Sequence, residues 1–243
     1  MCRMIGFASA DPMDVTPFLA RLSDFSQSGN LVDGWERRPG GNHPDGWGIA
    51  WRGEGRIRIL GSGKPANADP LLSRSGMTTD RFIGHVRYAS DLATVNASNA
   101  HPFLVRETAL AHNGTFRGKI GEEARSRGVS DTLVFLERLS ALWVEKTLSR
   151  LREALAEILG DPGQVGDYSA ANLLIASGEA LFALRHYRRE GDYYTLYLRS
   201  EPGLAVVASE PPDGAPGWRL LGDGELVELH PQSPRSAFLA AAV

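Results

Sequence analysis

Apolar residues recur every three or four positions in several stretches of the chain, the spacing that a helix with one buried face requires. In the first stretch these residues are Val15, Phe18 and Leu22. Where the pattern begins at Ser130-Asp131, either side chain can cap a helix. Helices are predicted, in chain order, over 12–28, over 69–75, from 130–131 onward and over 145–159.

Short apolar runs between Gly-, Pro- and Asn-rich turns predict strands. These runs cover 2–8, 46–51, 56–60, 82–89, 108–112, 169–176, 180–187, 192–199, 204–209 and 217–230. The polar stretches 29–46 and 90–102 are predicted to be loops. Because the chain shows no internal repeat and no long linker, we expect a single α+β domain over 2–243.

Composition narrows the function classes. Hydrophobic residues make up 42% of the 243 residues and charged residues 23%, as in ordinary globular proteins. The net charge of −3 argues against a nucleic-acid partner. No apolar run reaches the roughly 18–20 residues of a membrane span, and the apolar stretch at the N-terminus is too short for a secretory signal. With one cysteine, no disulfide can form within the chain. We therefore predict a cytoplasmic protein with no membrane partner.

Cys2 directly follows the initiator Met. A small residue at position 2 permits removal of that Met, which would leave Cys2 with a free α-amine. An α-amine titrates near about 7.7–8.0 and a free thiol near about 8.5, so the two groups can exchange a proton at neutral pH. The ordinary interpretation of a lone cysteine is a small buried hydrophobe. Cys2 alone does not decide between them.

Four other residues allow both a structural and a chemical interpretation. Asn113-Gly114 is typical of a turn, but it can also supply an amide and a backbone N–H to an oxyanion. Arg87, inside an apolar strand, suits a structural or a substrate carboxylate. Asp131 suits a helix cap or a substrate ammonium. The His and Asp residues lack metal-ligand spacing, so no metal is predicted.

Several motifs in fixed order change these odds. They are Met-Cys-Arg at 1–3, Asp-Gly-Trp-Gly at 45–48, Gly-His-x-Arg-x-Ala-Ser at 84–90, Asn-x-His-Pro-Phe at 99–103, His-Asn-Gly at 112–114, Ser-Asp-Thr at 130–132 and Ala-Ser-Glu-Pro at 208–211. Through this set the chain resembles the class II glutamine amidotransferases of the N-terminal nucleophile (Ntn) hydrolase superfamily, from residue 2 to about 211.

The resemblance implies a four-layer α-β-β-α sandwich in which two antiparallel sheets face each other. It also implies that Met1 is removed, that Cys2 is the nucleophile and that its α-amine moves the proton. Asn113 and Gly114 match the oxyanion hole. Arg87 matches the residue that binds the glutamine α-carboxylate, and Asp131 matches the one that binds its α-ammonium.

Three more residues match motif positions near the substrate pocket: Ser90, His101 and Trp47. Ser90 stands where the synthase members usually have Thr, and Tyr88 where they usually have Trp. The family chemistry needs no cofactor, and the implied partner is a small molecule, glutamine or a γ-glutamyl amide.

The synthase members carry an acceptor-binding domain for which this chain is expected to leave no room. We therefore predict a stand-alone hydrolase that cleaves a γ-amide through a γ-glutamyl thioester. The alternatives are a glutaminase subunit that delivers ammonia to a separate synthase chain, a bile-salt or penicillin amidase, and a catalytically silent scaffold. A homo-oligomer is also open.

Overall fold

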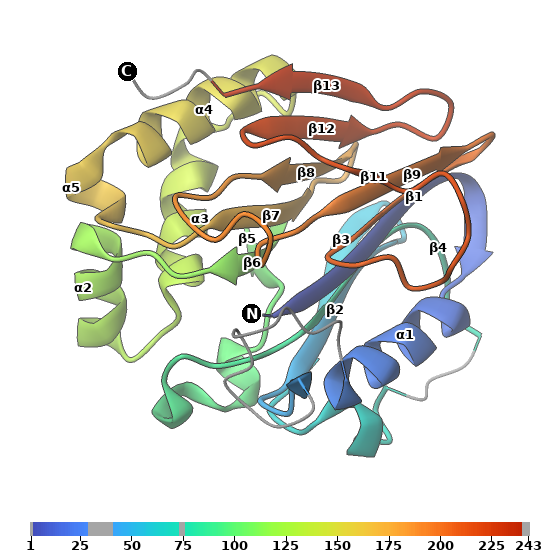
Figure 1. Ribbon diagram of the computed structural model, residues 1–243, viewed down its shortest axis with the longest axis horizontal. Helices are drawn as coiled ribbons and strands as arrows, with labels where there is room; N and C mark the ends of the chain where they lie inside the picture. Colours follow the sequence, from blue (N-terminus) through green and yellow to red (C-terminus); the bar gives the residue numbers. More distant parts are fainter. Residues whose placement is uncertain (1, 29–40, 73–75, 240–243) are drawn as a thin grey trace.

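A computed structural model describes residues 2–28, 41–72 and 76–239. Its strands form two sheets in which neighbouring strands are antiparallel (Figure 1). The seven-stranded sheet has the order β11 (Arg219–Leu220), β9 (Tyr197–Glu201), β10 (Leu204–Ala208), β1 (Arg3–Asp14), β4 (Thr78–Val86), β2 (Trp47–Gly53), β3 (Arg56–Ser62). The six-stranded sheet has the order β13 (Arg235–Phe238), β12 (Glu225–Leu229), β8 (Leu181–Arg185), β7 (Ala171–Ala176), β6 (Thr108–Gly114), β5 (Phe103–Val105).

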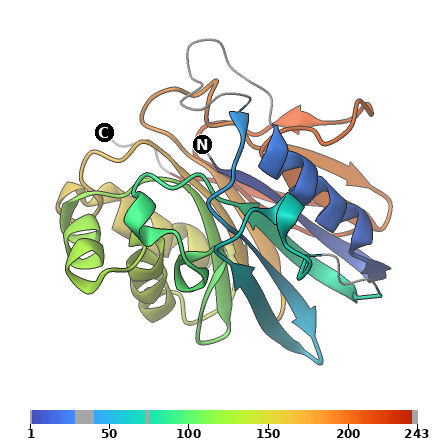
Figure 2. The same ribbon diagram turned by 90° about the horizontal axis from the view of Figure 1, so that it is seen from below.

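Helices cover the outer face of each sheet (Figure 2). Helix α1 (Thr16–Gln27) packs on the seven-stranded sheet through Leu19, Leu22 and Phe25. The other face of the molecule carries α2 (Gly118–Arg127), α3 (Asp131–Leu142), α4 (Leu148–Gly160) and the short α5 (Pro162–Val165). The predicted four-layer sandwich is confirmed. No helix in the described part of the chain is both long and apolar enough to cross a membrane.

Three apolar clusters hold the four layers together. One lies between α1 and the first sheet, one between the two sheets, and one between the second sheet and α2–α4. The middle cluster combines alanines, among them Ala50, Ala109, Ala111 and Ala183, with larger apolar residues such as Leu174. Side chains from the inner faces of both sheets make up this cluster, which packs the two sheets face to face.

Several sequence predictions are corrected. The first helix begins at Thr16, not at 12, because β1 continues to Asp14, whose carboxylate accepts the Thr16 N–H. The helix predicted over 69–75 is absent as far as the structure describes it, because the Asp69 carboxylate accepts the Leu71 N–H and forms a turn. A 3₁₀ turn, η2 (Ala66–Ala68), precedes it.

Two strand predictions were too long. The strand predicted over 192–199 begins only at Tyr197, because the N–H groups of Tyr193 and Tyr194 turn back to the Glu190 carbonyl. The run 217–230 divides into β11 and β12, which belong to different sheets. The predicted loop over 29–46 lies mostly outside the described residues, and that over 90–102 contains the 3₁₀ turns η3 (Leu92–Thr94) and η4 (Ala97–Asn99).

Candidate active site

Cys2 precedes β1 and lies where the two sheets meet. Its main-chain nitrogen donates a hydrogen bond to Asn113 Oδ1 on β6, at 3.1 Å. Its Sγ lies 3.4 Å from the amide nitrogen and 3.7 Å from the carbonyl oxygen of Tyr88, which follows β4. The half-buried thiol is therefore held by main-chain atoms of the segment that follows β4 of the first sheet, while the adjacent nitrogen is held by a side chain of the second sheet.

Strand β6 explains why Asn113 reaches Cys2. Side chains alternate along a strand, so Ala111 and Asn113 share the face toward the first sheet. His112 points to the helix layer instead, where its ring stacks on Phe116 at a centroid distance of 4.4 Å. Asn113-Gly114 is thus not a hairpin turn: the strand runs through Gly114, which pairs with Ala171.

Two donors lie at this end of β6. Asn113 is buried, and its Nδ2 makes no hydrogen bond within the described part of the chain. The N–H of Gly114 points to the same edge as that of His112, since N–H groups alternate along a strand. Strand β5 covers that edge only as far as Leu110. Gly114 has a φ of 151°, and an added Cβ would lie 1.9 Å from the Ala170 oxygen, so this position requires glycine.

Arg87 is a buried cation that immediately precedes Tyr88, the residue whose main chain contacts the thiol. Its Nη1 donates to the Thr94 carbonyl at 2.6 Å and its Nη2 to Thr94 Oγ1 at 2.7 Å. Burial lowers the pKa of Arg87, and the charges of Cys2, Asp45 and Asp131 oppose that shift. The guanidinium is therefore largely removed from water and is stabilised by the carboxylates of Asp45 and Asp131.

Asp131 is the first residue of α3. The N-cap of this helix is Ser130, one of the two residues predicted as possible caps. Asp131 Oδ2 accepts the Phe116 N–H at 2.6 Å, and Oδ1 accepts the Thr132 N–H at 2.8 Å. This carboxylate ties the segment after Gly114 to the helix. An ionised carboxylate has about four acceptor positions, so further donors can bind to it.

His101, which lies two residues before β5, links that segment to β6 and to the start of α3. Its Nδ1 is 3.2 Å from the His112 carbonyl, and its Nε2 is 3.2 Å from Ser130 Oγ. An added Cβ at Gly48 would lie 2.4 Å from the His101 carbonyl oxygen, so glycine there lets the loop approach the sheet. Both ring nitrogens of His101 are thus engaged within the protein.

The buried histidines predict an acid-sensitive fold. Burial, aided by the Arg87 charge, lowers the pKa of His85 to about 3, and burial also lowers the pKa values of His101 and His112. Below pH 6.5 these histidines bind more protons in the unfolded chain than in the folded chain. The free energy of unfolding therefore falls as the pH falls toward 3. From pH 7 to 5, His85 alone should cost about 2 kcal/mol of unfolding free energy.

Urea unfolding at pH 7, 6 and 5 measures this loss. The variant His230→Gln, at an exposed position, should lose the same amount as the unchanged chain. Equal unfolding free energies at pH 7 and 5 would contradict the prediction.

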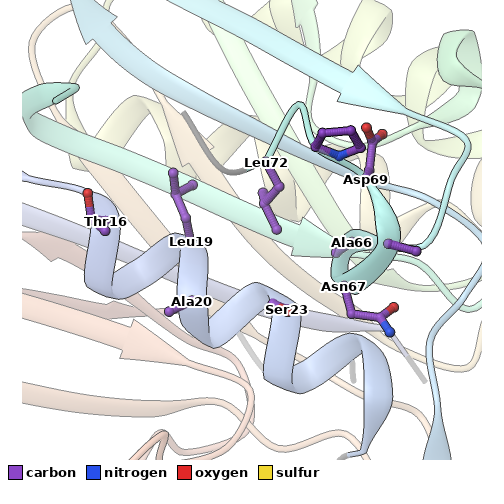
Figure 3. Close-up of a pocket in the computed structure, with 10 residues that line it drawn as sticks. Thr16, Leu19, Ala20, Ser23, Ala66, Asn67, Asp69 and Leu72 are labelled. Atoms are coloured by element: carbon purple, nitrogen blue, oxygen red, sulfur yellow. The ribbon is translucent and has the colours of Figure 1, made fainter. Parts of the chain in front are cut away.

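Two other predicted residues, Ser90 and Trp47, make no hydrogen bond to Cys2, Asn113, Arg87 or Asp131 in the described structure. Ser90 is exposed. Trp47 is buried on the α1 side of the first sheet, where its Nε1 donates to Asp69 Oδ2 at 3.2 Å. Asp69 borders a groove of ≈ 550 Å³ between α1 and residues 66–72 (Figure 3). Their parts in substrate binding stay predictions, and for Trp47 the geometry favours a core role.

Some residues to which the sequence analysis gave no role contact or pair with Cys2, Arg87 or Asn113. Arg3 forms a buried ion pair with Glu210, and its Nη1 lies 3.4 Å from the Cys2 carbonyl oxygen. Thr94 holds Arg87, and Asn172 is paired with Asn113. Arg3 and Glu210 lie inside the sequence motifs at 1–3 and 208–211, whereas Thr94 and Asn172 lie outside every motif that the sequence analysis identified. No group of three or more His, Cys, Asp or Glu residues suited to a metal ion occurs among the described residues.

Comparison with known proteins is consistent with this arrangement. Residues 1–212 match the model of the family "Glutamine amidotransferases class-II". A γ-glutamyl-hercynylcysteine sulfoxide hydrolase of Mycolicibacterium smegmatis is 28% identical over 94% of this chain and 96% of its own length. An uncharacterized protein of Methanocaldococcus jannaschii is 30% identical over 71% of this chain, which spans half the length of that protein.

Solved structures share the fold. A class-II domain protein from Silicibacter pomeroyi superposes with a TM-score of 0.66 and 19% identity, covering 98% of this chain and 100% of that one. The glutamine phosphoribosylpyrophosphate amidotransferase of B. subtilis gives a TM-score of 0.67 and 18% identity, covering 99% of this chain and 50% of that one.

Proposed function

We propose that this chain, which belongs to the class II glutamine amidotransferases and is an enzyme, hydrolyses the γ-amide bond of a γ-glutamyl compound with Cys2 as nucleophile. The observation that carries the proposal is the meeting of Cys2 and Asn113, from different sheets, at one hydrogen bond of 3.1 Å. The mycobacterial relative, similar over nearly its whole length, favours hydrolysis of a γ-glutamyl compound over ammonia delivery to a partner chain.

The residues suggest the following steps. Removal of Met1 turns the Cys2 nitrogen into an α-amine that Asn113 Oδ1 already holds. The amine takes the thiol proton, and the sulfur attacks the side-chain amide carbon. Asn113 Nδ2 and the Gly114 N–H then donate to the oxyanion. The C–N bond breaks as the ammonium gives its proton to the leaving amine.

Water completes the cycle by attacking the γ-glutamyl thioester. The amine accepts a proton from that water. The C–S bond then breaks as the resulting ammonium returns the proton to the sulfur, which releases glutamate and restores the thiol. At the other end of the substrate, Arg87 binds the α-carboxylate and Asp131 the α-ammonium, which fixes the attack geometry. No step in this scheme draws on a cofactor.

Intact-mass measurement after incubation with an electrophilic glutamine analogue tests the proposal. Loss of one Met together with one adduct on Cys2 is the expected result. A chain that keeps Met1 and forms no adduct contradicts the proposal. Loss of Met1 without an adduct keeps the nucleophile but removes the γ-glutamyl substrate class.

Arg87→Lys should raise KM for glutamine by about tenfold or more, because a point charge replaces a two-pronged donor. Steady-state kinetics of glutamate release measures the change. Arg52→Lys is a matched control. Arg52 donates hydrogen bonds to Asp80 through two nitrogens and has no part in the proposed substrate site, so its replacement should leave KM unchanged. An unchanged KM in Arg87→Lys would make Arg87 a structural anchor for Thr94.

A further inference from the structure

Two residues after β10 fix the start of β1. Ser209 Oγ accepts the Met4 N–H at 2.9 Å, and the Ser209 N–H donates to the Met4 carbonyl at 2.8 Å. Glu210 forms the buried ion pair with Arg3. The motif at 208–211, which the catalytic scheme leaves without a role, therefore holds the two residues that follow Cys2.

Asn172 stands on the opposite side of the site. It is fully buried on β7, directly across from Asn113 on β6. Opposed residues of an antiparallel pair share a face, so the two side chains are neighbours between the sheets. Asn172 Oδ1 accepts the His186 N–H at 3.1 Å, and Nδ2 donates to the Thr195 carbonyl at 3.3 Å.

Thr195 connects these two ends. Its Oγ1 donates to the Ser209 carbonyl at 2.7 Å. A continuous chain of contacts thus runs from Asn172, beside Asn113 on the second sheet, through Thr195 and Ser209 to Met4 on the first. The apolar side chains between the sheets are non-directional in their packing. Hydrogen bonds, in contrast, prescribe distance and angle.

We propose that Asn172, Thr195 and Ser209 are positioning residues that set Cys2, which directly precedes β1 of the first sheet, against Asn113 on the second. This inference rests on the proposed function only for its kinetic consequence. The geometric consequence, a fixed environment for Cys2, holds for whatever reaction the site performs.

The test removes one hydroxyl. Thr195→Val keeps the side-chain shape, and should lower kcat for L-γ-glutamyl-p-nitroanilide about five- to tenfold, the rate equivalent of one neutral hydrogen bond. KM should stay within about twofold, because Thr195 acts through Cys2 and Asn113 rather than on the substrate. Thr195→Ser, which keeps the hydroxyl, should restore kcat.

A second readout does not depend on turnover. The chain has one cysteine, so ¹³C-labelled cysteine gives a single Cα signal from Cys2. That signal should shift in Thr195→Val and in Asn172→Asp, which replaces the amide donor by a carboxylate of the same size. Thr108→Val is the matched control, since the buried Thr108 hydroxyl has no partner in the described structure. It should change neither kcat nor the signal.

The outcomes separate the two claims. An unchanged kcat and an unmoved Cys2 signal in Thr195→Val overturn the positioning role. A raised KM at constant kcat, or equal losses in Thr195→Val and Thr195→Ser, overturns it as well. If the unchanged enzyme does not hydrolyse the anilide, the proposed substrate class fails, and the Cys2 signal still decides the positioning role.

Discussion

Cys2→Ala is expected to lower γ-glutamyl amide hydrolysis by about 10⁴-fold or more while the protein stays folded. The thiol supplies the bond that splits amide hydrolysis into two easier steps, and no other cysteine exists to replace it. Glutamate release from glutamine measures the loss. The fold should persist because the hydrogen bonds of Sγ in the described structure are weak ones to the main chain of Tyr88, which follows β4.

Cys2→Ser separates the nucleophile from the amine. It keeps the α-amine and the contact to Asn113 Oδ1 but replaces the thiol by a hydroxyl, which is a weaker nucleophile at neutral pH. Activity should be far below that of the unchanged enzyme, and thermal unfolding should be similar in both variants. Full activity in Cys2→Ala would remove Cys2 from the mechanism.

The sequence predicted the parts of the fold that carry a strong apolar period. Helix α4 is an example, with a buried stripe that contains Leu151, Leu155 and Ile158. Helix α2 was missed because it buries only Ile120, Gly121 and Ala124, and two glycines weaken its helical signal. Strand β13 was missed because its residues are mostly exposed, as an edge strand allows.

The site was predictable only through motifs, not through periodicity. Cys2 and Asn113 are 111 positions apart in the sequence, and the packing of one sheet against the other brings them together. The part of Trp47 in substrate binding stays a prediction that rests on the motif alone, since alternation along β2 turns its indole toward α1, away from the space between the sheets. The sequence did not point to Asn172 or Thr195 for a related reason. The local sequence does not distinguish a polar residue that bridges two sheets from one that faces water.

Asn113→Ala is expected to lower kcat by about 10²–10³-fold, the effect of losing one oxyanion donor. The buried Nδ2, which bonds nothing in the described chain, is free for an oxygen that becomes negative only during the reaction. Because the donor acts in the transition state, KM should change little. Kinetics of glutamate release separates kcat from KM.

Asn113→Asp tests which half of the amide matters. An aspartate keeps an oxygen for the Cys2 nitrogen, now 3.1 Å from Oδ1, but it removes the donor and places an anion beside the oxyanion. If the donor is decisive, Asn113→Asp should be at least as slow as Asn113→Ala. Asn67→Ala, at an exposed position beside α1, should keep full activity. An Asp variant close to the unchanged enzyme would instead assign Asn113 to holding the Cys2 amine, and leave the Gly114 N–H to bind the oxyanion.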